Sequence, residues 1–137
     1  MVPPVRISSA VLDTLLAHAR REGALECCGL LAGRDGVIST ALPARNALAS
    51  ETSFEIAPAE LFEMFRLMRA RGLEHMGIYH SHPVGENAPS SRDIGKAYYP
   101  GVAYFIISPT PGASNAVRAF AIQEDAAEEL PIEVVSA

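Results

Sequence analysis

The chain has 137 residues, of which 49% are apolar and 20% are charged, and its formal net charge at pH 7 is −5. This length and composition are typical of one globular domain, so we expect residues 1–137 to form a single domain rather than a disordered chain or two domains. An acidic balance without a basic cluster argues against nucleic acid and anionic membranes as partners.

The first part of the chain predicts a helix followed by a hairpin. Residues 9–22 place apolar side chains on one face at helical spacing, with serines before them and Gly23 after them. Two apolar runs, residues 25–33 and 37–43, flank the sequence Arg-Asp-Gly. An Asp-Gly turn between apolar runs is typical of a β-hairpin, so we expect two antiparallel strands after the helix.

A loop, a short strand and a second helix are predicted next. Residues 46–51 are expected to form a loop and residues 53–56 a short strand. Residues 58–71 begin with Pro58, which is favoured in a first helical turn, and end before Gly72. The expected core-facing stripe of this helix consists of Leu61, Phe62, Phe65 and Met68, with Met64 also on the core side.

The second half of the chain predicts mainly strands. Residues 102–108 form a continuous apolar run, which is typical of a central strand covered on both faces. The other expected elements are strands at residues 75–80, 116–123 and 131–135, a short helix near residues 91–98, and an acidic loop before the last strand. Helices interleaved with roughly five or six strands, some of them joined by hairpins, indicate an α/β sandwich with a mixed sheet.

Two of the four histidines, His80 and His82, stand two residues apart at the end of a predicted strand. Because side chains alternate faces along a strand, both imidazoles project to the same side, with Cα atoms roughly 6.6 Å apart. This spacing suits the chelation of a metal ion. A surface histidine pair can also arise without a metal, so the pair alone leaves both interpretations open.

The polar segment after these histidines supplies a candidate third ligand. Pro83 ends the strand, Ser90 is a candidate helix cap, and Asp93 then falls at the third helical position. From there Asp93 can turn back toward the histidine pair. An aspartate three residues after a serine cap is also an ordinary variant of the capping box, so a purely structural role is the alternative.

Glu26 stands in the apolar segment of residues 25–33, whose other members carry no charge. An unpaired carboxylate in such surroundings costs several kcal/mol, so it needs a partner. A water held by a metal that two histidines and an aspartate bind would supply that partner. The alternative is a solvated Glu26 at the mouth of the strand, without a function.

The positions Glu26, His80-Ser-His82-Pro, Ser90 and Asp93 together resemble the JAMM motif of the MPN+ (Mov34/PAD-1, JAB) zinc metallopeptidases, and the chain looks most like their short prokaryotic branch. The match includes the proline after the second histidine and the serine three residues before the aspartate. The order of the predicted helices and strands also agrees with that family. The resemblance implies a JAB/MPN-type fold, in which a mixed sheet is flanked by helices in a cytidine-deaminase-like sandwich.

The resemblance also implies a role for each motif residue. His80, His82 and Asp93 would bind one Zn²⁺ per chain and leave one coordination position open, as catalytic zinc sites do. Glu26 would act as the general base toward the metal-bound water, and the Ser90 hydroxyl would stabilise the oxyanion. The expected reaction is hydrolysis of a peptide or isopeptide bond.

The family also indicates the class of substrate. Its members cleave after the C-terminal diglycine of ubiquitin-like proteins, and the short prokaryotic branch implies sulfur-carrier proteins of the β-grasp type as partners. A homodimer is a possible oligomeric state that the sequence leaves undecided. The alternative function is a non-catalytic MPN-type scaffold or interaction domain that binds metal without turnover. A nucleobase deaminase is disfavoured because the H-x-E and P-C-x-x-C patterns of that class are missing.

The chain start and the cysteines bear on the compartment. Residues 1–10 lack the charged region and the long apolar run of a signal peptide, and no apolar stretch approaches the roughly 18 residues of a membrane span. The only cysteines, Cys27 and Cys28, are adjacent and cannot join distant parts of a fold. We therefore expect the protein in the reducing cytoplasm.

Overall fold

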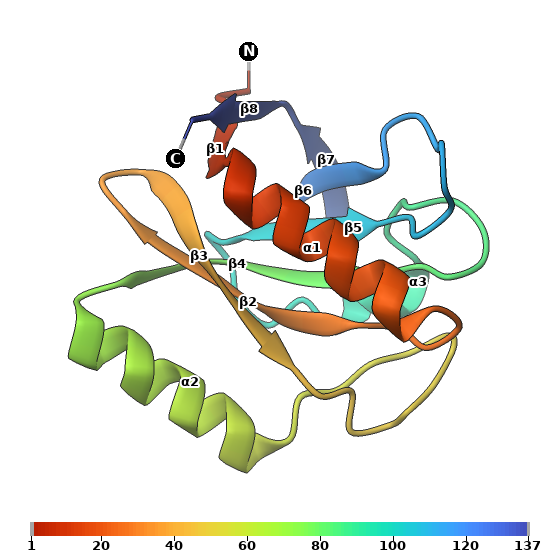
Figure 1. The fold of residues 1–137 in the computed structure, drawn as a ribbon, viewed down its shortest axis with the longest axis horizontal. Helices are drawn as coiled ribbons and strands as arrows, with labels where there is room; N and C mark the ends of the chain where they lie inside the picture. Colours follow the sequence, from red (N-terminus) through yellow and green to blue (C-terminus); the bar gives the residue numbers. More distant parts are fainter. Residues whose placement is uncertain (1, 137) are drawn as a thin grey trace.

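An eight-stranded mixed sheet with three helices makes up the computed structural model, which describes residues 2–136 (Figure 1). The elements in chain order are β1 Val5–Ser8, α1 Ser9–Glu22, β2 Cys28–Arg34, β3 Val37–Ala44, α2 Pro58–Arg71, β4 Glu74–Ser81, α3 Ser91–Gly95, β5 Ala103–Ile107, β6 Val117–Gln123, β7 Ala126–Leu130 and β8 Ile132–Val135. The strand order across the sheet is β7-β6-β5-β4-β2-β3-β1-β8. Within residues 2–136, none of the helices combines the length and the hydrophobicity that a membrane crossing requires.

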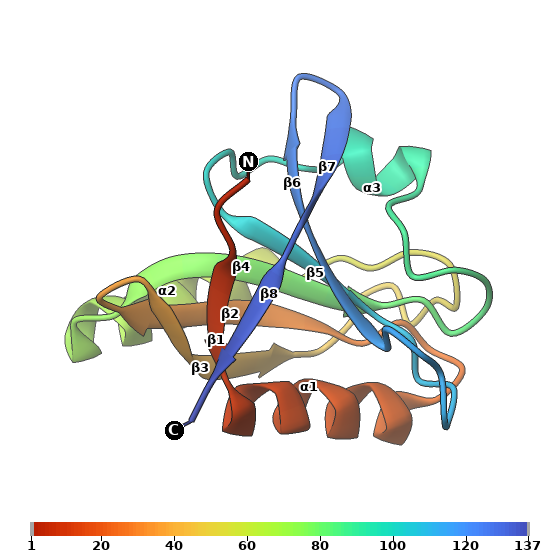
Figure 2. The same cartoon turned by 90° about the horizontal axis from the view of Figure 1, so that it is seen from above.

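The two faces of the sheet carry separate apolar clusters. On one face, α1 contributes Val11, Leu15 and Ala19 to a cluster of buried side chains. On the other face, α2 contributes Met64 and Met68. Figure 2 shows α1 and α3 on opposite sides of the sheet. Because both faces are covered, all five residues of β5 are buried, as predicted for a central strand.

Local sequence sets the ends of α1 and the turn of the first hairpin. The Ser8 side chain accepts a hydrogen bond from the Val11 N–H at the start of α1, and Gly23, with a φ of 59°, ends the helix. Between β2 and β3, Asp35 and Gly36 have φ values of 55° and 77°. This left-handed backbone is what a two-residue hairpin turn requires. The predicted first helix and hairpin are therefore confirmed.

β4, the strand that ends in the histidine motif, lies between β2 and β5 in the middle of the sheet. It runs antiparallel to β2, with Cys28 opposite His80, and parallel to β5, with Ile106 opposite His80. Pairing with β5 extends beyond the end of β4, because the His82 N–H donates to the Ile107 carbonyl oxygen at 2.9 Å. The end of β4 therefore meets the start of β2 at one end of the sheet, and the candidate site lies there.

Two predictions about loops and strands are wrong. Residues 53–56 form no strand, because their backbone pairs with the loop at residues 46–47, through the Asn46 side chain and the Ala47 N–H, rather than with a neighbouring strand. The acidic segment that was expected to be a loop contains β7, which pairs with β6 through a turn at Glu124 and Asp125. With β1 also unpredicted, the sheet has eight strands instead of five or six.

The second and third helices differ in detail from their predictions. α2 has the predicted bounds, but Phe62 is 64% exposed and only Met64 and Met68 are buried, so the core-facing stripe is narrower than expected. α3 ends at Gly95 rather than near residue 98. A glycine in a helix costs more backbone entropy than any other residue, which favours an end at this point.

Candidate metal centre

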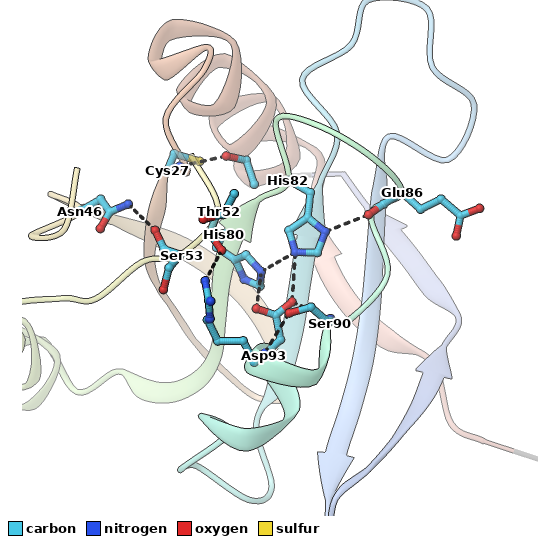
Figure 3. Close-up of polar contacts among 11 residues, drawn as sticks. Cys27, Asn46, Thr52, Ser53, His80, His82, Glu86, Ser90 and Asp93 are labelled. Carbon is cyan, nitrogen blue, oxygen red and sulfur yellow. Dashed lines mark hydrogen bonds and ion pairs between the residues drawn. The ribbon is translucent and has the colours of Figure 1, made fainter. Parts of the chain in front are cut away.

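Two imidazoles and a carboxylate converge at the C-terminal end of β4 (Figure 3). The Nε2 atoms of His80 and His82 lie 3.1 Å apart. Asp93 places Oδ1 3.2 Å from the His80 Nε2 and Oδ2 3.0 Å from the His82 Nε2. Among residues 2–136 these three side chains form the only group of three or more histidines, cysteines or acids whose ligand atoms all lie within 4.8 Å of one another. The structure thus brings the three predicted ligands together.

The hydrogen bonding of His82 leaves an unshared electron pair pointing into this group. Its Nδ1 lies 2.8 Å from the Glu86 carbonyl oxygen, which can only accept. In the neutral imidazole Nδ1 therefore carries the proton and Nε2 does not. A cation between the nitrogen and carboxylate lone pairs would relieve their repulsion, and two imidazoles with one carboxylate are a donor set that suits catalytic zinc. The residues present thus fit Zn²⁺.

Asp93 is held in place by the start of α3. The Ser90 Oγ accepts a hydrogen bond from the Asp93 N–H at 3.0 Å, and Asp93 Oδ2 accepts one from the Ser90 N–H at 2.9 Å. This capping box and the orientation toward the histidines, which were alternatives in the sequence, are both present. Burial alone would raise the pKa of Asp93, but when the Nε2 atoms of His80 and His82 carry protons, their hydrogen bonds to the carboxylate outweigh burial and hold that pKa well below its usual range.

Phe54 packs flat against His80 from the loop that precedes α2. The two ring centroids lie 4.6 Å apart, with an interplanar angle of 23°. The stacking restricts rotation of the His80 ring, whose side chain is only 3% exposed. Nothing in the sequence indicated this contact, because it depends on where an irregular loop crosses the sheet.

Glu26 lies two residues before β2 and is 4% exposed. Its Oε1 is the only buried side-chain nitrogen or oxygen atom of residues 2–136 without a hydrogen-bond partner. Burial raises the pKa of Glu26 to about 7 and is the largest influence on it. The negative charge of Asp93 also raises this pKa, whereas the positive charges of His82, Arg92 and Lys96 lower it. Glu26 therefore stands at the mouth of the strand, as one alternative expected, but it is buried and close enough to interact with the ligand group.

Asn46 fixes the backbone around Glu26. Its Nδ2 donates to the carbonyl oxygens of Glu26 at 3.1 Å and of Ser53 at 2.9 Å, and its Oδ1 accepts from the Glu55 N–H at 3.2 Å. The Glu26 N–H in turn donates to the Ser50 carbonyl oxygen at 2.9 Å. The sequence predicted a loop here but not this role, since an asparagine in a polar loop is unremarkable by composition.

Ser81, between the two histidines, is fully buried and joins β4 to the residue after Glu26. Its Oγ accepts a hydrogen bond from the Cys27 N–H at 2.8 Å, and its own N–H donates to the Cys27 carbonyl oxygen at 3.1 Å. These two bonds connect the strand that carries the histidines to the segment that carries Glu26.

A narrow cavity of about 30 Å³ adjoins the ligand group, and its lining includes His80 and Asp93. A space of this size holds about one water molecule. A wider groove of about 230 Å³ shares the lining residues Phe54, Ile78 and Lys96 with this cavity. The cavity and the groove thus place apolar and cationic side chains next to the ligands.

The other histidines and the cysteines take no part in the ligand group. His18 lies 2.9 Å from the Tyr79 hydroxyl, and His75 lies 3.0 Å from a main-chain carbonyl oxygen. Cys27 and Cys28 are free and buried, and burial raises their pKa values to about 11 and about 12. Both thiols are therefore protonated at neutral pH.

The chain matches a known family and several known proteins. Residues 8–123 match the family described as prokaryotic homologs of the JAB domain. The chain is 31% identical to the CysO-cysteine peptidase of Mycobacterium tuberculosis over 131 residues, which cover 94% of this chain and 90% of that protein. It is 36% identical to the desampylase of Haloferax volcanii over 105 residues, which cover 71% of this chain and 75% of that protein.

A solved structure agrees with these matches. The solution structure of a protein from Desulfitobacterium hafniense superposes with a TM-score of 0.86 and 31% identity, over 96% of this chain and 93% of that chain. The family match spans every position of the predicted motif, from Glu26 to Asp93. This protein therefore belongs to the prokaryotic branch of the JAB domain (JAMM/MPN) family, and the predicted JAB/MPN-type fold is confirmed.

Proposed function

We propose that this protein is a zinc-dependent peptidase that hydrolyses the peptide or isopeptide bond after the C-terminal diglycine of a ubiquitin-like or sulfur-carrier protein. The observation that carries the proposal is the convergence of His80, His82 and Asp93 near the buried Glu26, whose Oε1 has no hydrogen-bond partner. The family and the names of two relatives, a CysO-cysteine peptidase and a desampylase, support the same class of reaction.

His80, His82 and Asp93 would hold one zinc ion per chain through two imidazole nitrogens and a carboxylate oxygen. Three protein ligands leave zinc a free position, which distinguishes catalytic from structural sites. When bound, zinc polarises a carbonyl group and lowers the pKa of water in the site.

Glu26 would move the protons of the reaction. In the metal-free protein burial raises its pKa to about 7, and beside a bound cation its carboxylate can take a proton from the attacking water and return it to the departing amine. Oε1 is the atom for this task, since it has no other hydrogen-bond partner.

Ser90 would donate its hydroxyl proton to the oxyanion that forms on the scissile carbonyl. Its Oγ already accepts the Asp93 N–H, which leaves the hydroxyl proton free to point elsewhere. Capping α3 and stabilising the oxyanion are therefore compatible in one side chain. Loss of one such donor typically lowers kcat by about 10² to 10³.

The proposal extends to the partner and the setting. The partner is a β-grasp carrier whose extended glycine tail reaches the ligand group. Free, buried cysteines agree with a reducing cytoplasm. Residues 1–137 would act as a single metallopeptidase domain, either alone or as a homodimer.

The test uses a β-grasp carrier protein whose C-terminal diglycine is joined to a reporter. Zinc-loaded wild type should release the reporter, and removal of metal with a chelator should stop cleavage until zinc is added back. Glu26→Gln should bind one equivalent of zinc and cleave at least about 10² times more slowly, because the proton acceptor is missing. The exposed Glu63→Gln on α2 is the matched control and should cleave like wild type. One equivalent of bound zinc without cleavage by wild type would indicate the non-catalytic scaffold instead.

A further inference from the structure

Two cationic side chains, Arg92 and Lys96, lie beside the metal ligands. Both line the narrow cavity of about 30 Å³, together with His80 and Asp93. They stand four positions apart, Arg92 within α3 and Lys96 at its C-cap, so their side chains project from the same side of the helix. Lys96 is the only lysine of a chain whose net charge is −5. Although the net charge of the chain is negative, two positively charged side chains therefore lie next to the proposed metal ligands.

Neither cation is neutralised by the protein. Within residues 2–136, neither Arg92 nor Lys96 has a carboxylate at ion-pair distance, and unlike the other cations without one, both line the cavity beside the ligand group. Arg92 donates one hydrogen bond, from Nη1 to the Thr52 carbonyl oxygen at 3.0 Å. This bond positions the guanidinium group and leaves its other N–H donors free, an arrangement that suits a carboxylate.

The two cations lie close to Glu26, the group that would protonate the leaving amine. Both act to lower the pKa of Glu26, so their charges reach its carboxyl group. If Glu26 returns the proton to the departing nitrogen, that nitrogen must come next to Glu26. In an amino acid joined through its α-amino group, the α-carboxylate is two covalent bonds from this nitrogen. Such a carboxylate would enter a region that already holds Glu26 and Asp93, and it needs a cation there.

Resting on the proposed function, we propose that Arg92 and Lys96 bind the α-carboxylate of a single amino acid joined to the carrier's terminal glycine. The preferred substrate is then a carrier tail that ends in one free amino acid, rather than an isopeptide on a protein lysine, which brings no carboxylate to this position. In the reaction one water is consumed and the amide C–N bond breaks. The carrier keeps a glycine carboxylate, and the amino acid leaves with a free amine.

The test compares two peptides that carry the same diglycine tail and the same final amino acid. One peptide ends in a free carboxylate and the other in a carboxamide, so only the charge differs. Wild type should cleave the acid with about tenfold higher kcat/KM than the amide, as expected for a hydrogen bond to a charged group. This ratio should fall to near one in Arg92→Gln/Lys96→Gln and stay at the wild-type value in Arg66→Gln, whose guanidinium lies on α2.

The outcomes separate this inference from the proposed function. Equal cleavage of acid and amide by wild type, or an unchanged ratio in the double variant, would overturn the inference and leave the peptidase intact. If zinc-loaded wild type cleaves none of the two peptides, a lysine isopeptide and the β-grasp carrier–reporter fusion, the proposed function itself is overturned. Because both peptides are measured on each variant, a general loss of activity after substitution of Arg92 does not affect the ratio.

A binding measurement gives a second readout. Reductive methylation with ¹³C-formaldehyde labels only Lys96 and the α-amino group, since the chain has no other lysine. In the zinc-loaded Glu26→Gln variant, the Lys96 methyl resonance should shift when the acid peptide is added and stay in place with the amide. Identical shifts with both peptides would contradict recognition of the carboxylate.

Discussion

At the scale of single residues, Glu26 links the site to the stability of the fold. Its carboxyl group is buried and Oε1 has no partner, so burial raises its pKa from 4.5 to about 7. Between these two values the folded chain keeps a proton on Glu26 that the unfolded chain has released. The folded state thus binds more protons, and by linkage the free energy of unfolding falls as the pH rises through this window.

Glu26→Gln should remove this decrease in the free energy of unfolding with rising pH, because glutamine has the same shape as glutamate and does not ionise. In metal-free protein at about pH 8, we expect the variant to be more stable than wild type by about 1 to 3 kcal/mol, with the difference shrinking toward about pH 5. Urea denaturation across this range measures the effect. Parallel pH profiles of the two proteins would mean that the Glu26 carboxylate is well solvated in the fold.

At the scale of elements, the loop between β3 and α2 depends on Asn46. One side chain accepts hydrogen bonds from the Leu48 and Glu55 N–H groups and donates to the carbonyl oxygens of Glu26 and Ser53. The same loop carries the phenyl ring that stacks on His80. The proposed general base and one of the proposed metal ligands thus depend on the same loop.

Asn46→Ala should therefore lower both stability and activity. We expect a loss of about 1 to 3 kcal/mol in the free energy of unfolding, because several main-chain groups lose their partners, together with a lower kcat/KM. Asn46→Asp keeps the acceptor oxygen but not the donor, so it should fall between alanine and wild type. Urea denaturation and carrier cleavage measure the two effects. If alanine has no effect on either, the loop is held by its other contacts.

The elements that were predictable carry a complete local pattern. α1 has a cap, an apolar stripe and a terminating glycine, and the β2–β3 hairpin has its Asp-Gly turn. β1 and β7 lack such a pattern, because β1 has only four residues and four of the five residues of β7 are exposed. These strands are defined by pairing with partners distant in the chain, which periodicity does not reveal.

The residues of the candidate site also differ in how far the sequence alone could predict them. His80, His82 and Asp93 were predictable because they fall within one short segment, whose strand and helix start fix their directions. Phe54 and Asn46 were not, since their positions depend on the path of an irregular loop through three dimensions. The roles of Glu26 and Ser90 stay predictions that the carrier-cleavage assay addresses.

At the scale of the whole molecule, zinc binding should stabilise the fold. Its proposed ligands come from the end of β4 and from α3, so the unfolded chain has no comparable site. A ligand at 100 times its dissociation constant adds about 2.7 kcal/mol, which corresponds to a rise in Tm on the order of 10 °C for a chain of this length. Calorimetry with and without zinc should show this rise in wild type.

Two variants check where the metal binds. Asp93→Asn keeps an oxygen that can accept the Ser90 N–H but loses the charge, so it should lose most of the zinc-dependent rise in Tm. Asp13→Asn, on the exposed side of α1, is the matched control and should keep it. A full rise in Asp93→Asn would place the bound zinc elsewhere.

The parallel pairing of β1 with β8 has a consequence for synthesis of the chain. Arg6 in β1 contacts Glu133 in β8, 127 positions later. On the ribosome, one edge of β1 lacks its neighbour until Ile132–Val135 have left the exit tunnel. An open strand edge can pair with another polypeptide, so the nascent chain is exposed to misassociation at this edge until β8 has emerged and paired with β1.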